Sequence, residues 1–116
     1  MARSVGLDIA ETIVRAAELE GSGRRLRVVR WAEREIVAAE GRPWADAAAE
    51  AVAALFAEHR LPREGVVAAL DANDLLLRPL SLPFKSDDQI RKVVKFELES
   101  QLQNYAADDL VVDFVV

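Results

Sequence analysis

The feature that most constrains the fold is a glycine-rich link between two apolar, β-rich runs near the N-terminus. The link is Gly21-Ser22-Gly23, and it joins the run 12–19 to the run 26–37. Two such runs on either side of a short Gly-Ser-Gly segment favour a β-hairpin. Because a further apolar run, 4–9, precedes them, this region predicts three consecutive strands. We expect the third strand to bend near residues 33–35.

An alanine-rich segment follows the predicted strands. Alanine has the highest helix propensity, and apolar side chains recur at helical spacing between residues 44 and 60, so this segment predicts a helix. The unbroken apolar run 66–70 then predicts a strand buried on both faces. Residues 71–74 predict a turn. The run 75–82 predicts another strand, at an edge or a bulge because it contains Pro79.

A second helix is predicted between Ser86 and Asn104, the residues that we expect at its two ends. Ser86 and Gln89 have the spacing of a capping box. The run 110–116 after this helix predicts a last strand. The sequence ends within that apolar run, so we expect the chain to be a fragment of a longer protein.

Glu97 interrupts the apolar stripe of the second predicted helix. An isolated buried carboxylate is costly, so we expect Glu97 to form a structural ion pair with Arg78 or Arg91. Glu97 and Glu99 cannot act as an acid/base pair, because residues two apart on a helix point in different directions.

Composition excludes several kinds of site. The chain of 116 residues has the length of one domain, and its 52 % hydrophobic content indicates a globular protein. It contains no cysteine and a single histidine, His59, which excludes thiolate metal sites and disfavours a Ser-His-Asp triad. The net charge of −5 argues against nucleic-acid binding. No apolar run approaches the ~20 residues of a membrane span. We therefore expect a cytoplasmic location and no direct membrane insertion.

The chemically most informative segment runs from Gly6 to Arg15. Asp8 lies near the end of the first predicted strand, at a tight turn, where a carboxylate can face a metal-bound phosphate. A glycine and a small hydroxyl residue nearby, such as Thr12, allow backbone N–H groups to approach phosphate oxygens. The alternative is an ordinary hairpin with Asp8 at its rim.

Two further groups have simpler interpretations. Asp108, Asp109 and Asp113 could form a cation site, but a solvated entry to the last strand is favoured. Trp31 and Trp44 flank the connection from strand to helix and are interpreted as packing residues.

Four segments together resemble the N-terminal part of the PilM/GspL family, the actin-like proteins of type IV pilus and type II secretion platforms. They follow in the family's order along essentially the whole chain. They are VGLDIA (5–10), RPLSLP (78–83), FELESQL (96–102) and DDLVVDF (108–114).

The resemblance implies an α/β (α+β) fold of the ribonuclease-H-like, actin-like type. Residues 1–72 would be the first actin-like subdomain, with the order β-β-β-α-β. Residues 73–116 would be the start, β-α-β, of a small inserted subdomain. The second half of the actin-like fold would be missing, together with its other nucleotide-binding residues.

The resemblance also implies a function. The chain would be a scaffold rather than an enzyme, peripheral to the inner membrane through its partners. It would capture a short cytoplasmic tail of a membrane protein near 73–84 and 86–103, and it would contact the assembly ATPase. The partner-binding candidates are Arg78, Leu80, Leu82, Phe84 and Phe96. The acidic surplus of the C-terminal half suggests a basic tail. An exposed edge on the final strand would allow a homodimer.

The sequence departs from the family at the phosphate loop. Ala10 and Glu11 stand where nucleotide-binding members have glycine followed by serine or threonine. Ala10 adds a Cβ where the backbone should approach a phosphate, and Glu11 adds a repelling carboxylate. Asp8, Ala10, Glu11 and Thr12 therefore predict a degenerate loop. We expect no cofactor in this fragment; the alternative is a full-length parent that binds ATP and magnesium.

Overall fold

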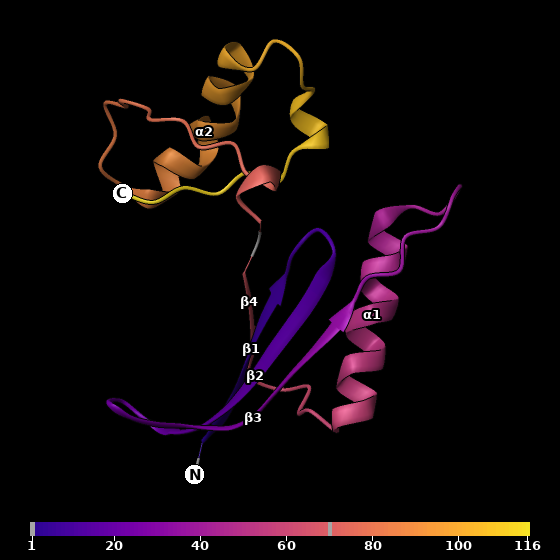
Figure 1. Cartoon of the computed structure of the whole chain (residues 1–116). Helices are drawn as coiled ribbons and strands as arrows, with labels where there is room; N and C mark the ends of the chain where they lie inside the picture. Colours follow the sequence, from indigo (N-terminus) through magenta and orange to yellow (C-terminus); the bar gives the residue numbers. More distant parts are fainter. Residues whose placement is uncertain (1, 70) are drawn as a thin grey trace. The chain divides into compact units, whose positions relative to one another are not determined.

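The computed structural model describes residues 2–69 and 71–116, and within them the fold is mixed α+β, with a four-stranded mixed sheet and two α-helices. The chain divides into two units, Met1–Leu75 and Leu76–Val116. Figure 1 traces the chain through both. We refer to them below as unit 1 and unit 2 and describe each by itself.

Unit 1 contains the sheet, whose strand order is β3-β2-β1-β4. Its strands are β1 (Arg3–Ile9), β2 (Ile13–Ser22), β3 (Arg25–Glu35) and β4 (Val66–Ala69). The pairs β1–β2 and β2–β3 are antiparallel, and β4 pairs in parallel with β1.

The predicted glycine link is confirmed as the β2–β3 hairpin. Gly21 has a φ of +130°, and a Cβ there would lie 2.0 Å from the carbonyl oxygen of Arg25, so a side chain does not fit. Gly23 also has a positive φ. The third strand is irregular at a different place from the one expected. Its register shifts beside Glu18 and Leu19, where Val29 has no partner, whereas Glu33 and Glu35 pair in register. The extra residue of a bulge, rather than the charged run 33–35, interrupts β3.

One face of the sheet, here called the inner face, is covered by the helix α1 (Trp44–His59). The helix packs on β2 and β3. It ends at Arg60, which adopts the left-handed conformation, as the last turn closes on the carbonyl of Phe56. The buried core joins both elements and consists of Val5, Leu7, Val14, Ala16, Ala32, Ile36, Ala47, Ala48, Ala51, Leu55, Phe56 and Leu61.

The expectation that the strand 66–70 is buried on both faces is wrong. Every residue of β4 is exposed, because β4 is an edge strand and the helix lies toward the other edge of the sheet. Leu70 lies outside the described residues. The predicted turn at 71–74 is a short 3-10 helix, η1 (Ala72–Asp74).

Unit 2 is built on the helix α2 (Asp87–Gln101), followed by the 3-10 turn η2 (Ala107–Asp109). The predicted strands 75–82 and 110–116 are wrong, since neither segment forms a ladder with another described segment. In 110–116, Leu110, Val112 and Phe114 are half-buried while Val111 and Val115 are exposed. The segment thus shows the alternating burial that is typical of a strand, but no described segment forms backbone hydrogen bonds with it as a neighbouring strand.

The ends of α2 differ in part from the prediction. Ser86 is the N-cap residue, but its side chain makes no capping hydrogen bond, and the C-cap is Leu102 rather than Asn104. The turn closes at Leu102 because its N–H bonds the carbonyl of Leu98. Within the described residues, no helix is long and apolar enough to cross a membrane.

The expected ion pair of Glu97 is also wrong. Glu97 is exposed on α2 and pairs with no described cation. Arg91 instead lies 3.7 Å from Asp113 and stacks over the ring of Phe114, 5.1 Å from its centroid. A solvated glutamate needs no partner, so the interruption of the stripe costs this helix little.

Candidate functional site

Asp8, the proposed phosphate-facing carboxylate, lies in a row of surface charges. Its Oδ2 is 3.5 Å from the NH1 of Arg15, whose Nε is 3.6 Å from the Oε2 of Glu33. All three side chains are about half exposed. One arginine therefore serves two carboxylates across three neighbouring strands, and the row keeps a net negative charge.

The turn from β1 to β2 is held by backbone contacts. The N–H of Ala10 donates to the carbonyl of Ile13 at 3.0 Å. The carbonyl of Glu11 accepts from the indole Nε1 of Trp44 at 2.8 Å. Thr12 accepts at its carbonyl from the N–H of Ile36, also at 2.8 Å. These bonds tie the turn to the start of α1 and to the segment after β3.

These residues do not fit a nucleotide phosphate. The N–H of Ala10 is already used within the hairpin, and the exposed side chain of Glu11 adds a second carboxylate to that of Asp8. A phosphate loop needs several free N–H groups converging on one oxygen cluster. In the part of the chain that the structure describes, no three acidic or histidine side chains gather as ligands for a metal. Thr12 is exposed at the same turn.

The buried carboxylate of this chain is Glu18, which the sequence analysis missed. Its side chain is 1 % exposed, with Oε1 3.1 Å from Arg3 NH1 and Oε2 2.8 Å from Arg30 Nε. The NH1 of Arg30 also donates to the carbonyl of His59 at the end of α1. Each neighbouring strand carries one of the arginines, but only the register brings them to Glu18. Arg30 lies directly opposite Glu18, whereas Arg3 lies opposite Glu20 and reaches Glu18 diagonally. This cluster joins sheet and helix.

The face of the sheet opposite α1, here called the outer face, is uncovered. A groove of about 530 Å³ lies on it, between Trp31 on β3 and Val67 on β4. Trp31 is 71 % exposed, so its interpretation as a packing residue is wrong. The side chain points to the face that α1 does not cover, since it alternates with the buried Ala32. Trp44 is partly exposed and bonds the turn at Glu11.

A second groove, of about 640 Å³, lies on the inner face beside α1. It opens because α1 packs on β2 and β3, which leaves Ile9 on β1 and Val66 on β4 beside the helix residues Val52 and Phe56. Unit 1 therefore has apolar grooves on both faces of its sheet.

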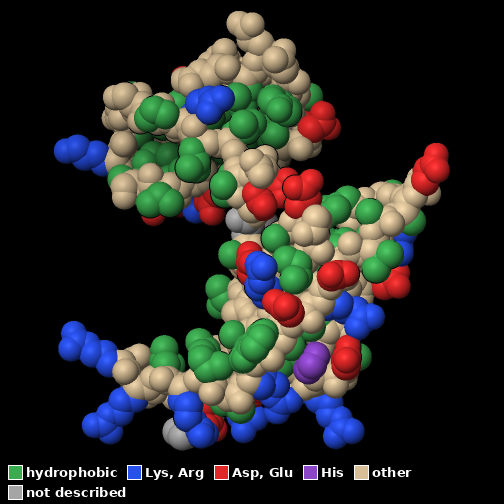
Figure 2. All heavy atoms as spheres, viewed as in Figure 1, with side chains coloured by type: hydrophobic (Ala, Val, Ile, Leu, Met, Phe, Trp, Pro, Cys, Tyr) green, Lys and Arg blue, Asp and Glu red, His purple; other side chains and the backbone are tan. Residues whose placement is uncertain are grey.

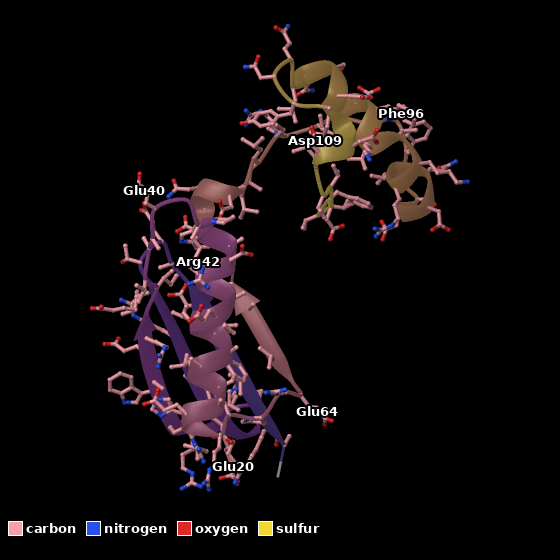
Figure 3. All side chains as sticks on the ribbon, turned by 90° about the vertical axis from the view of Figure 1, so that its right-hand side faces the viewer. Glu20, Glu40, Arg42, Glu64, Phe96 and Asp109 are labelled. Carbon is pink, nitrogen blue, oxygen red and sulfur yellow. The ribbon has the colours of Figure 1, made fainter. Side chains whose placement is uncertain are left out.

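The partner-binding candidates all lie in unit 2 and fall into two groups. Phe84 and Phe96 are exposed, the latter by 71 %, and Figure 3 labels Phe96 on α2. Leu80 and Leu82 are half-buried within the unit. Arg78 is exposed, and its NH1 donates to the neighbouring carbonyl of Leu77. The two phenylalanines and Arg78 are thus the candidates available to a partner, whereas Leu80 and Leu82 are partly covered within the unit.

The three aspartates considered as a cation site do not gather. Asp108 pairs with Lys95 at 3.6 Å and Asp113 pairs with Arg91 at 3.7 Å, while Asp109 is exposed. Figure 3 labels Asp109 in the same unit as Phe96. These exposed pairs join the end of the chain to α2 with little energy each.

A scan against protein-family models finds no match to this chain, and a search of curated proteins finds no match either. Its function is therefore inferred from its residues and their contacts.

Proposed function

We propose that the chain is a cytoplasmic scaffold of a type IV pilus or type II secretion inner-membrane platform, and that it works through protein–protein contacts. The observation that carries this proposal is the exposure of large apolar side chains on both units, among them Trp31, Val67 and Phe96. Extended apolar surface of this kind marks interaction sites. The degenerate turn at Ala10 and Glu11 supports a role without nucleotide chemistry.

The proposal includes an actin-like fold for unit 1. Three antiparallel strands, a helix and a strand parallel to β1 follow in that order, as the family resemblance of VGLDIA at 5–10 leads us to expect. Under the same proposal, residues 73–116 are the beginning of the inserted subdomain.

The proposed ligand of unit 2 is a basic cytoplasmic tail of a membrane protein, with the assembly ATPase as a further partner. Residues 76–116 carry seven acidic and five basic side chains, a net charge of −2. Phe84 and Phe96 supply exposed aromatic anchors, and aromatic side chains often dominate binding energy at interfaces. An opposite charge on the tail would accelerate its association.

The direct test is a calorimetric titration of the protein with a synthetic peptide. The peptide is a basic segment of about 15 residues that contains apolar side chains, the chemistry proposed for the tail. We expect saturable binding that Phe96→Ser weakens about tenfold, the loss typical of one aromatic anchor. Gln101→Ser, another exposed position of α2, is the matched control and should bind as the parent does. Equal binding by both variants, or none by the parent, would contradict the proposed site.

A nucleotide-binding function is the second candidate. It is favoured by Asp8, which keeps an exposed carboxylate near the end of β1, and by the hydroxyl of Thr12. In this alternative, missing parts of a longer protein would complete the site for ATP and magnesium.

A further inference from the structure

The outer groove is a regular trough rather than an irregular depression. Trp31, Ala17, Gly6 and Val67 are register partners in succession and form one row across all four strands. The two central residues are the smallest available. The two outer residues, on the edge strands, are each 71 % exposed. The row therefore has a low floor between two tall apolar walls.

The dimensions of this trough match an α-helix. Three strand spacings separate its walls, or about 14 Å, and a helix with its side chains is about 10–12 Å across. The seven residues of β1 extend about 23 Å, the length of a helix of about 15 residues. Helices commonly cover sheet faces in this manner.

The floor is open above Gly6. A Cβ built on Gly6 would meet no atom within 4 Å, so the chain's own packing does not require glycine there. A glycine inside a strand often marks a place where another backbone approaches closely. The missing side chain at Gly6 leaves room for such an approach from outside.

The two ends of the trough carry different charges. Leu26 and Val28 extend its apolar surface toward the β2–β3 hairpin, and both are exposed. Beside them lie Arg24 and Arg25, which form no ion pair with any residue that the structure describes. Figure 2 shows basic side chains and apolar side chains together along this hairpin. The opposite end is the row of Asp8, Arg15 and Glu33, which is net negative.

We propose that the outer trough binds an amphipathic α-helix of a partner protein. The apolar stripe of this helix lies on Gly6 and Ala17 between Trp31 and Val67, and its acidic end lies beside Arg24 and Arg25. This interface goes beyond the tail site of unit 2 and does not depend on it.

A second copy of the chain is a poorer occupant of the same face. Two sheets pack face to face at about 10 Å, with side chains from both filling the space between them. Two floors made of Gly6 and Ala17 would face each other across that space and leave a void. A helix inserts its own side chains into the floor instead.

Fluorescence of Trp31 provides the test. The chain contains two tryptophans, so Trp44→Phe leaves Trp31 as the reporter. The probe is a synthetic helix of about 15 residues, free of Trp and Tyr, with a leucine stripe, glutamates in its first turn and lysines in its last, the arrangement that suits the helix dipole. We expect a saturable blue shift of Trp31 emission. Replacing the glutamates of the peptide with lysines should weaken binding about tenfold, as should Arg24→Glu combined with Arg25→Glu.

One variant tests the floor itself, and a second variant on α1 is its control. Ala17→Glu places a charge in the trough and should remove the shift. Ala57→Glu, at an exposed position of α1, should leave it unchanged. Circular dichroism checks that each variant folds, and Val67→Lys on the edge strand replaces Ala17→Glu if the latter does not.

Several results would overturn the trough proposal. They are no shift with the peptide, equal binding by the parent and Ala17→Glu, and equal binding of a peptide with a central proline, which would show that the bound peptide is not helical. A shift that depends on protein concentration without peptide would indicate self-association. Loss of tail binding in Phe96→Ser bears only on unit 2, so the two proposals can fail separately.

Discussion

The guanidinium Nε of Arg30 lies 2.8 Å from Oε2 of Glu18, a carboxylate with almost no exposed surface. The same arginine donates to the carbonyl of His59 at the end of α1. The pair therefore compensates a buried charge and attaches the helix to the sheet. On its other side, the carboxylate of Glu18 lies 3.1 Å from NH1 of Arg3.

Arg30→Ala should destabilise unit 1 by about 3 kcal/mol, because it leaves a buried carboxylate with one cation fewer. Replacing both partners, with Glu18→Leu and Arg30→Met, should recover much of this loss, since an apolar pair of similar size needs no compensation. Urea unfolding measures both variants. Equal loss in the single and the double variant would show that Arg30 acts through packing alone.

Trp31→Ala should change the free energy of unfolding by less than about 0.5 kcal/mol, because the side chain is largely exposed on the outer face. Leu55→Ala, in the core under α1, should lose about 2–5 kcal/mol. Thermal unfolding of the two variants compares the faces directly. A large loss for Trp31→Ala would mean that the outer face is packed in solution.

Glu20 should contribute to acid unfolding. The hydrogen bond from Arg27 holds the pKa of this carboxyl below its ordinary value of 4.5. A carboxyl whose folded pKa is lowered stabilises the fold above the unfolded pKa and loses that effect as pH falls through the folded pKa. Glu20→Gln should therefore flatten the fall of stability below about pH 4.5. An unchanged pH profile would contradict this role.

The hairpin and both helices could be predicted from the sequence because their signals are local. Gly21 and Gly23 provide the positive φ angles of the β2–β3 turn, and the alanines of α1 favour helix wherever they lie. The exposed wall at Trp31 could not be predicted in this way. Trp31 is as apolar as a core residue, and only the position of α1 decides which face of the sheet is covered.

Two predictions that were wrong, the strand 110–116 and the ion pair of Glu97, have the same physical origin. The segment 110–116 has the composition of a strand, but a strand needs a hydrogen-bonding neighbour, and none of the described segments pairs with it. Glu97 interrupts an apolar stripe yet is solvated, whereas Glu18 in a strand is buried. The partners of Glu18 come from strands β1 and β3, so its environment depends on register across the sheet. The sequence predicts a tight turn after the first strand, and the structure has it between Ile9 and Ile13, but the hydrogen bond from Ala10 to Ile13 could be seen only in the structure.

The most direct test of the scaffold proposal is a pair of calorimetric titrations on this protein, one with the basic tail peptide and one with Mg-ATP. We predict saturable binding of the peptide and no binding heat for Mg-ATP. The N–H of Ala10 already donates to the carbonyl of Ile13, and the carboxylate of Glu11 would repel a phosphate at this turn. Micromolar binding of Mg-ATP that Asp8→Ala abolishes, with no binding of the peptide, would contradict the proposal.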